Sequence, residues 1–170
     1  IYFFSLSAEN NHVQSQMILA KIYFEDRIVK QDIQKAIYYY SKASNQNDAE
    51  AQFNLGLIYY EDKYGIKDFE RSIHFFSLSA ENNCVQSQII LAKIYFEDRI
   101  VKQDIQNVIY YYSKASELQN PEAQFNLGLI YYEDKYGNKN VMKSIHYFSL
   151  SAEQNYVQSQ LILAKIYFEG

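Results

Sequence analysis

The sequence predicts an all-α protein built as an α-solenoid, a stack of antiparallel helix pairs with a 36-residue repeat inside a 72-residue double repeat. Two observations support this prediction. When the chain is shifted by 36 residues against itself, Tyr23 falls on Tyr59 and Asp32 falls on Asp68. When it is shifted by 72, most residues match. A fixed period in this range is typical of solenoids, because one repeat cannot bury its apolar face alone.

The period divides the chain into four full repeats and two partial ones. The chain starts with an isoleucine, and both ends cut through predicted helices. We therefore expect a single repeat array that is part of a longer one, with neighbouring repeats of the same chain at both ends. The partial repeats are 1–14 and 159–170, and the full repeats are 15–50, 51–86, 87–122 and 123–158.

The first part of each repeat predicts a helix, which we call helix A. After Ala51, apolar residues recur at Leu55, Ile58 and Tyr59, which is the spacing of one helical face. The sixth residue of each repeat is Ala or Gly. Glycine lowers helix propensity, so its presence predicts a close approach between helices. The predicted helices A cover residues 15–26, 51–62, 87–98, 123–134 and 159–168.

After a polar connector, each repeat predicts a second helix, helix B. The residue before its apolar run is Asp or Asn, a favoured N-cap worth about 1 kcal/mol. The run usually ends at Asn, which favours a left-handed C-terminal cap. Asn120 followed by Pro121 is a good start for the fourth full repeat. The N-caps are Asp32, Asp68, Asp104 and Asn140. The predicted helices B cover residues 1–9, 33–45, 69–81, 105–117 and 141–153.

Composition narrows the function class. Apolar residues make up 48% of the chain, enough for a continuous core, and no apolar run approaches the roughly 18 residues of a membrane span. The net charge of −4 argues against nucleic-acid binding. Cys84 is the only cysteine, so no intrachain disulfide can form, and no Asn-x-Ser/Thr site is present. These features favour a reducing, cytoplasmic location.

Features that could suggest catalysis recur with the repeat, as structural features do. The acidic pair Glu61-Asp62 recurs in each full repeat, is always followed by Arg or Lys, and is interpreted as a solvated helix end. His74 and His146 lie two repeats apart, too far to share a metal ion. Cys84 lies in a predicted turn and is interpreted as a surface residue, with a reactive thiol as the alternative. We expect no catalytic site, cofactor or metal within residues 1–170.

The repeated residues resemble the pattern of the Sel-one-like repeat family, a relative of the tetratricopeptide repeat. The resemblance covers the whole chain and recurs in every repeat. One departure is systematic, because Asp replaces the family's glycine at the end of helix A at Asp26, Asp62, Asp98 and Asp134, and only Gly170 restores it. The matching residues are Ala51, Leu55, Gly56, Tyr59, Asp68, Phe75, Phe76 and Ala80, and in the first full repeat Asp32, Lys35, Ala36, Tyr39, Tyr40, Lys42 and Ala43.

The resemblance implies a right-handed superhelix with helix A on its concave side, and a scaffold or adaptor role. On helix A, the side opposite the core stripe should be polar, yet it carries large apolar residues, alternating Lys and Leu, and a constant Glu. We interpret this row as a candidate partner-binding groove. The alternative is that its rings pack against the next helix A. The candidate residues are Met17, Lys21, Phe24, Glu25, Phe53, Leu57, Tyr60, Glu61, Ile89, Lys93, Phe96, Glu97, Phe125, Leu129, Tyr132 and Glu133.

The leading functional prediction is a non-enzymatic interaction scaffold. Its concave, aromatic- and Glu-lined groove would hold a protein segment with apolar anchors and Lys or Arg. The alternative is a structural array that docks laterally through its outer helices within a large assembly. RNA binding by a helical repeat is a third possibility, but the helix A face is not basic. A fused catalytic domain outside residues 1–170 would leave this array as a regulatory arm.

Overall fold

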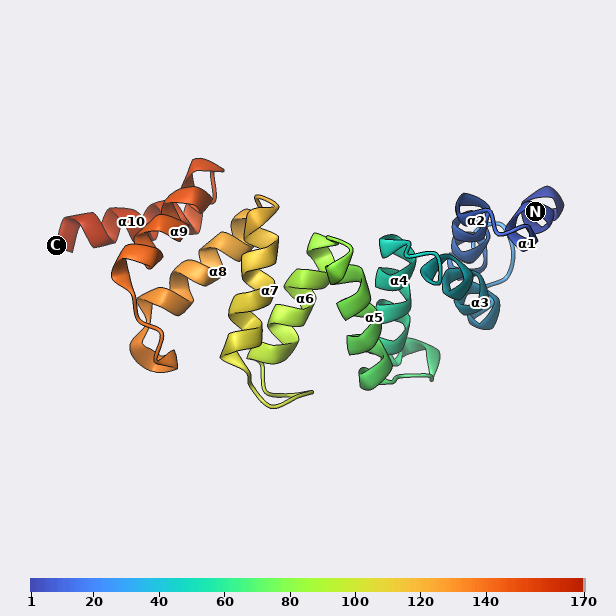
Figure 1. Cartoon of the computed structure of the whole chain (residues 1–170), viewed down its shortest axis with the longest axis horizontal. Helices are drawn as coiled ribbons and strands as arrows, with labels where there is room; N and C mark the ends of the chain where they lie inside the picture. The colour runs from blue at the N-terminus through green and yellow to red at the C-terminus, as the bar shows by residue number, and fades with distance from the viewer. Residues whose placement is uncertain (170) are drawn as a thin grey trace. The chain divides into compact units, whose positions relative to one another are not determined.

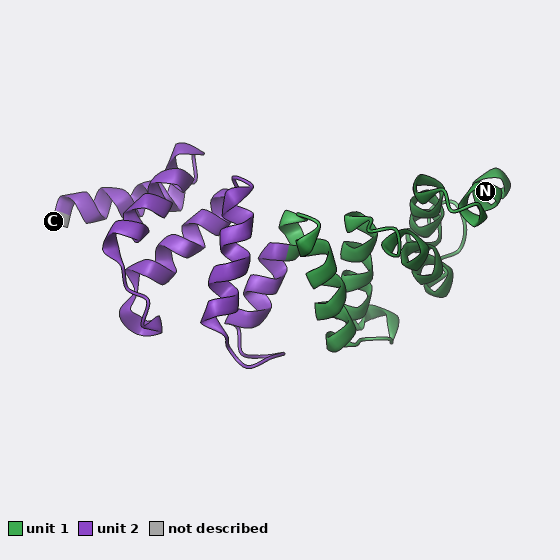
Figure 2. Ribbon diagram, in the orientation of Figure 1, with its two compact units in different colours: residues 1–87 green, residues 88–170 purple. Residues whose placement is uncertain are grey.

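The computed structural model describes the backbone of residues 1–169 and the side chains of residues 1–168. The described chain is all-helical and contains no β-strand, which confirms the predicted class. It divides into two compact units, one formed by Ile1–Ser87 and the other starting at Gln88 (Figure 2).

Helices A and B alternate along the chain, helices A with even numbers and helices B with odd numbers (Figure 1). The first unit holds α1 (Tyr2–Glu9), α2 (Val13–Phe24), α3 (Ile33–Ser44), α4 (Ala49–Tyr60) and α5 (Phe69–Glu81). From the end of the first unit the chain continues with α6 (Val85–Phe96), α7 (Ile105–Glu117), α8 (Pro121–Tyr132), α9 (Val141–Glu153) and α10 (Val157–Glu169). Short 3-10 turns, η1 (Asp62–Tyr64) and η2 (Asp134–Tyr136), follow α4 and α8.

Helices B lie where they were predicted, but helices A begin about two residues earlier than predicted. The cause is their N-caps. The side chains of His12, Asp48 and Asn120 accept a hydrogen bond from the backbone N–H three residues later, at 3.3, 2.8 and 2.9 Å. An N-cap is the last non-helical residue, so each helix starts directly after it. Pro121 accordingly takes the first helical position, as predicted.

The predicted caps of helices B are confirmed. The side chains of Asp32, Asp68 and Asn140 each accept the N–H three residues later at 3.0 Å, and Asp104 accepts two N–H groups at 3.0 and 3.1 Å. The residues after helices B are left-handed, with φ between 61° and 63°, at Asn11, Asn47, Asn83, Gln119 and Asn155.

The backbone of each helix B N-cap closes the connector onto the preceding helix A. Its N–H donates to the carbonyl of the tyrosine one residue before the end of helix A. This removes one of the free carbonyls that every helix end carries. The N···O distances are 2.7–3.0 Å in the pairs Asp32–Tyr23, Asp68–Tyr59, Asp104–Tyr95 and Asn140–Tyr131.

The connectors have two alternating forms. After α2 and α6, Asp26 and Asp98 are left-handed at φ 52°, and their carboxylates accept backbone N–H groups of the connector at 2.8 and 2.9 Å. After α4 and α8 the chain forms η1 and η2, and Gly65 and Gly137 are left-handed at φ 67°. After α2 and α6, the aspartate that replaces the family's glycine at the end of helix A has a left-handed backbone. After α4 and α8, the left-handed residue is instead a glycine three residues further along the chain.

Each full repeat joins helix A to helix B through one stacked pair of rings. The ring planes lie within 10° of parallel, and the centroids are 5.8–6.0 Å apart. Such pairs contribute about 0.5–1.5 kcal/mol beyond the area that they bury. The pairs are Tyr23–Tyr39, Tyr59–Phe75, Tyr95–Tyr111 and Tyr131–Tyr147.

Two glycines let helices A and B approach closely, which confirms the predicted use of small residues. A methyl group at Gly56 would lie 2.6 Å from ring carbons of Phe76, and one at Gly128 would lie 2.5 Å from those of Phe148. The Ser72 hydroxyl donates to the Gly56 carbonyl at 3.0 Å across the same contact.

A buried glutamine in helix A ties three helices together, a feature that the sequence analysis missed. The Gln16 amide donates to the Ala8 carbonyl of α1 at 3.0 Å and accepts from Gln46, just beyond α3, at 2.9 Å. Gln124 accepts in the same way from Gln154 at 2.7 Å. Buried polar groups are usually paired, so the Gln16 bonds hold α2 between α1 and the end of α3.

Candidate partner-binding site

The predicted row on helix A is more buried than expected at the third residue of the repeat. Met17 and Ile89 are only 3% and 8% exposed, so they belong to the core and offer no surface to a partner. Phe53 and Phe125 are half-buried, and the Phe53 ring lies 5.9 Å from that of Phe76. The reason is that a helix A such as α2 packs against the preceding helix B as well as its own.

Two rings at the tenth residue of the repeat pack against their own helix B, whereas the alternative interpretation placed these rings against the next helix A. Tyr60 lies 6.2 Å from Phe76, and Tyr132 lies 6.4 Å from Phe148. Part of the row nevertheless stays accessible, because Tyr132 is 40% exposed and Phe96 is 37% exposed.

Both lysines of the row within the full repeats form ion pairs with the first turn of the next helix A. The Lys21 Nζ atom lies 2.7 Å from Glu50, and that of Lys93 lies 2.8 Å from Glu122. Both pairs are about half exposed, so each contributes only about 0.2–1 kcal/mol. The positive charge of each lysine is therefore already paired with a glutamate and contributes little to binding a negatively charged partner.

The constant Glu of the row differs between the two connector forms. Glu25 lies 3.6 Å from Arg27, and Glu97 lies 3.8 Å from Arg99. Glu61 and Glu133 are exposed, and no cationic nitrogen of the described residues lies within 4.0 Å of their carboxylates. These two carboxylates are the ones available to a cationic partner.

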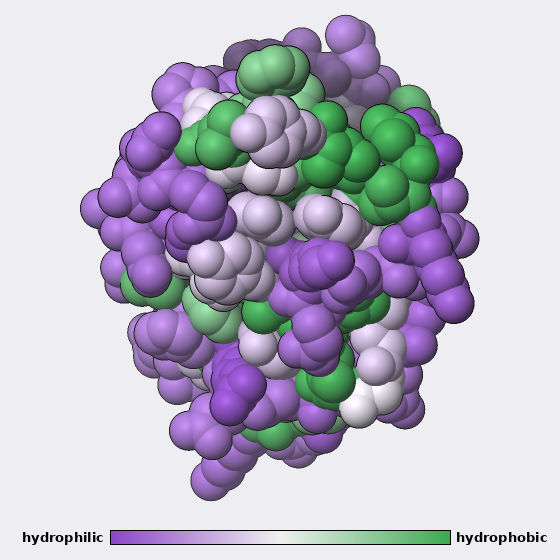
Figure 3. All heavy atoms as spheres, turned by 90° about the vertical axis from the view of Figure 1, so that its right-hand side faces the viewer, coloured by the Kyte–Doolittle hydropathy of each residue, from purple (hydrophilic) through white to green (hydrophobic). Residues whose placement is uncertain are grey.

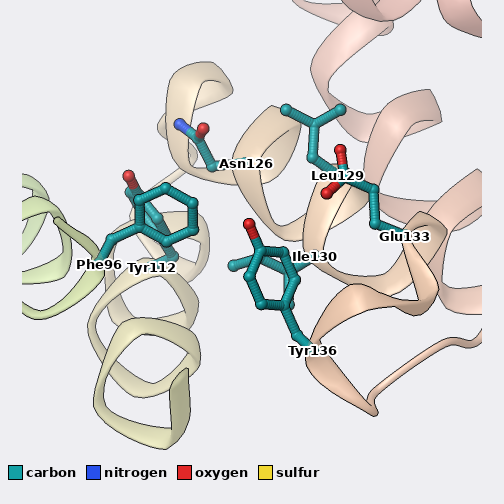
Figure 4. A pocket seen from close by; sticks show the side chains of 7 residues that line it. All are labelled: Phe96, Tyr112, Asn126, Leu129, Ile130, Glu133 and Tyr136. Carbon is teal, nitrogen blue, oxygen red and sulfur yellow. The ribbon is translucent and has the colours of Figure 1, made fainter. Parts of the chain in front are cut away.

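A hollow of about 80 Å³ in the second unit brings part of the row together. Figure 4 shows its lining, with the ring of Tyr136 from η2 beside that of Phe96 from α6. The two ring centroids are 5.8 Å apart, edge to face. Phe96, Leu129 and Glu133 belong to the predicted row. The other lining residues are Tyr112 from α7, Asn126 and Ile130 from α8, and Tyr136.

The polar groups around this hollow are mostly fixed. The Asn126 side chain donates to the Glu122 carbonyl at 2.8 Å. Burial, and then the negative charges of Glu122 and Glu97, raise the pKa of the Tyr112 hydroxyl above its usual value, so this hydroxyl stays protonated. The hollow therefore combines apolar ring surface with the carboxylate of Glu133, and it suits an apolar or a cationic side chain.

The first unit carries the same set of residues. A shift of 72 residues places an identical residue at every lining position. The Phe24 and Tyr64 rings lie 5.7 Å apart, close to the value in the second unit. They border a more polar hollow of about 360 Å³, to which Lys63 and Arg27 contribute. The seven equivalents are Phe24, Tyr40, Asn54, Leu57, Ile58, Glu61 and Tyr64.

The sequence analysis missed four of the lining residues because they lie outside the row on helix A or on its other faces. Tyr112 belongs to helix B, and Tyr136 belongs to a connector that the sequence analysis described only as polar. One signal was available, since the tyrosine is kept at both Tyr64 and Tyr136, which are related by the 72-residue shift, in a connector that is otherwise mostly polar.

The side chains that were considered for catalysis make contacts within their own connector, helix or turn. The carboxylate of Asp26 holds its own connector. His74 and His146 are exposed and lie against the neighbouring rings of helix B. Cys84 is half-buried, with its sulfur 3.4 Å from the side chain of Gln86. Within residues 1–168, no group of three or more His, Cys, Asp or Glu side chains is placed to hold a metal ion.

No helix in the described part of the chain is both long enough and apolar enough to cross a lipid bilayer.

Comparison with protein families gives a match to the Sel1 repeat over four consecutive segments. They start two residues before the predicted repeats, at the observed start of each helix A. A search of curated proteins found no match. The matched segments are residues 13–48, 49–84, 85–120 and 121–156.

Several solved structures are similar over most of the chain. A protective antigen with an SLR fold from uropathogenic Escherichia coli is 31% identical, with a TM-score of 0.83 over 99% of this chain and 36% of its own. A Sel1 repeat protein from Oxalobacter formigenes is 30% identical, with a TM-score of 0.73 over 93% of this chain and 64% of its own. Cysteine-rich protein B of Helicobacter pylori is 25% identical, with a TM-score of 0.58 over 81% of this chain and 99% of its own. The chain thus spans about a third to two thirds of the first two proteins.

Proposed function

Because the chain belongs to the Sel1 repeat family, whose members generally act as protein-interaction scaffolds and are generally non-catalytic, we propose that it is a non-enzymatic scaffold that binds a protein segment on its helix A side. The binding site is the hollow that contains Phe96, Leu129 and Glu133, together with the seven equivalent residues of the first unit. The observation that carries this proposal is the identity of all seven lining residues between the two units.

The chemistry of the hollow defines the partner. An apolar side chain of the partner would pack on the Phe96 and Tyr136 rings. A neighbouring Lys or Arg would approach Glu133, whose carboxylate has no cation near it among the described residues. The same rings can also attract a cation directly, which contributes about 0.5–1 kcal/mol at an exposed site.

The rings and the carboxylates make different contributions to binding. Exposed ion pairs contribute only about 0.2–1 kcal/mol each, so the rings supply most of the affinity. The carboxylates of Glu61 and Glu133 orient the segment and make its binding weaker at high salt.

A peptide selection tests the proposal directly. Peptides from a random library displayed on phage are selected against the 170-residue chain, and the best peptide is measured by fluorescence polarisation. Because the residue set is duplicated, each substitution is made in both copies. Tyr64→Ala together with Tyr136→Ala should weaken binding by about 30-fold or more, as expected for a ring at the centre of an interface. Glu61→Gln together with Glu133→Gln should weaken it only a few-fold, and only at low salt.

A matched pair of tyrosines on helices B provides the control. Tyr38 and Tyr110 are 46% and 49% exposed and are also related by the 72-residue shift. Tyr38→Ala together with Tyr110→Ala should leave the affinity unchanged. If this pair abolishes binding while the Tyr64 and Tyr136 variants keep it, and all variants remain folded, docking through the outer helices replaces the proposed site. Selection of peptides without apolar or basic residues would also contradict the proposal.

A further inference from the structure

Apolar side chains gather on the side of the molecule where α1 lies (Figure 3), but a contact that recurs within the full repeats joins a cation to an aromatic ring. In three of the four full repeats, a cation of helix B lies over the tyrosine near the end of helix A. The cationic atom is 5.0–5.4 Å from the ring centroid, within the distance of about 6 Å at which a ring face attracts a cation. The three pairs are Lys35 over Tyr23, Arg71 over Tyr59 and Lys143 over Tyr131.

In the first two full repeats the same cation also contacts the N-cap carboxylate of helix B. The Lys35 Nζ atom lies 3.5 Å from Asp32, and the Arg71 Nε atom lies 3.3 Å from Asp68. The tyrosine ring and the N-cap carboxylate therefore form one receptor that accepts either a lysine or an arginine. The side chains of Lys35 and Arg71 are 57% and 63% exposed, so this receptor opens to solvent.

The third full repeat keeps this receptor but has Asn107 in place of the cation. Tyr95 stacks on Tyr111 at 5.9 Å, and the backbone N–H of Asp104 donates to the Tyr95 carbonyl at 3.0 Å, as in the other full repeats. The Asn107 side chain donates to the Asp104 carboxylate at 2.9 Å but brings no charge. The side chains of Tyr95, Asp104 and Asn107 are all partly exposed.

The charge of Asp104 and the face of Tyr95 are therefore available to a cation from outside the chain. Among the described residues, no cationic nitrogen lies within 4.0 Å of the Asp104 carboxylate. Over the same part of the chain, no lysine or arginine lies over the Tyr95 ring.

From this comparison of the four full repeats we infer that Tyr95 and Asp104 bind a lysine or arginine side chain of a protein partner. The partner's cation lies over the Tyr95 ring, in the place that Lys35 has over Tyr23, and it pairs with the carboxylate. This site shares no residue with the hollow that contains Phe96, so either site can fail its test without affecting the other.

The expected strength of the contact follows from its two parts. A cation on an exposed ring and one exposed ion pair together strengthen the binding of a larger partner about 3-fold to 30-fold. The same contact made by a small cation alone corresponds to a Kd on the order of 100 mM. Nuclear magnetic resonance of the tyrosine rings can measure binding of this strength.

The test uses the 170-residue chain with ¹³C-labelled tyrosine rings, titrated with N-acetyl-arginine amide to about 200 mM at constant ionic strength. The ring signals of Tyr95 should shift and approach saturation. Those of Tyr59 and Tyr131 should stay in place, because cations of the chain already lie over these rings. N-acetyl-glutamine amide, which is uncharged, should shift none of them.

Three variants connect the response to the proposed residues. Asn107→Lys should abolish the response of Tyr95, because the new lysine takes the place that Lys35 has in the first full repeat. Gln106→Lys is the matched control, because it adds the same charge at an exposed neighbouring position of α7, and it should keep the response. Lys35→Asn should create the response at Tyr23, since it exposes the same ring and carboxylate there.

Four outcomes would overturn the inference, provided that far-UV circular dichroism shows all variants to be folded. They are a Tyr95 shift no larger than that of Tyr59, the same shift with the glutamine analogue, an unchanged response in Asn107→Lys, and no response of Tyr23 in Lys35→Asn. Loss of the Tyr95 response in Gln106→Lys would also count against it, because added charge alone would then explain the effect of Asn107→Lys.

Discussion

Replacing Gly56 by alanine should destabilise the protein, although alanine is favoured over glycine within a helix by about 0.5–1 kcal/mol. The added methyl group would lie 2.6 Å from two ring carbons of Phe76, about 1 Å inside the normal carbon contact distance of about 3.5–4.0 Å. Phe76 is fully buried, so its ring cannot move into solvent. Overpacking typically costs about 1–3 kcal/mol, which leaves a net loss of about 1 kcal/mol in the free energy of unfolding.

Thermal unfolding followed by circular dichroism measures this loss. For a chain of this size, about 1 kcal/mol corresponds to a fall in Tm of about 2–4 °C. Gly128→Ala should behave alike, because its methyl group would lie 2.5 Å from Phe148. Ala20→Gly is the reciprocal control, and it should also lower the Tm, since Ala20 is buried and its methyl group already fits. A higher Tm for Gly56→Ala would refute the reasoning, because helix propensity would then outweigh the contact.

Three further predictions concern the tyrosines, the ion pairs and the terminal helices. Burial raises the pKa of the Tyr112 hydroxyl, so as the pH rises this hydroxyl loses its proton in the unfolded chain before it does so in the folded one. The Tm should therefore fall as the pH rises above about 10, and Tyr112→Phe should reduce that fall. Lys93→Gln should cost at most about 1 kcal/mol in urea unfolding, because its ion pair with Glu122 is half exposed, and a larger loss that persists in high salt would contradict this. In dilute solution, amides of α1 and α10 should exchange hydrogen faster than those around Leu55, and equal protection would count against fraying from the ends.

Local signals in the sequence predicted the helix pairs well. Asp or Asn before an apolar run marks the start of helix B because the cap is a contact between neighbouring residues, and all four predicted caps formed. The start of helix A was misplaced by two residues for a related reason. The residue type directly before helix A changes from repeat to repeat, so the sequence has no constant signal for the N-cap. The residues at this position are His12, Asp48, Cys84, Asn120 and Tyr156.

The candidate site was harder to predict, because burial on helix A depends on two neighbouring helices and not on one. A helical face opposite the core stripe was expected to be accessible, yet Met17 and Ile89 are core residues. Tyr136 was missed because the η2 turn brings its ring onto Phe96, a contact that depends on how the connector folds back. Periodicity along a single helix contains no information about either contact.

The hydrogen bond between the Asp32 N–H and the Tyr23 carbonyl has a practical consequence for engineering. It joins the two ends of the connector, so the helix pair does not depend on the length of the segment between them. The two connector forms have different backbone conformations, yet both end in this same hydrogen bond. Lengthening a closed loop is inexpensive, about 0.6 kcal/mol for each doubling. A peptide tag or reporter inserted between Arg27 and Lys30 should therefore be displayed by this array without a shift of the helices on either side.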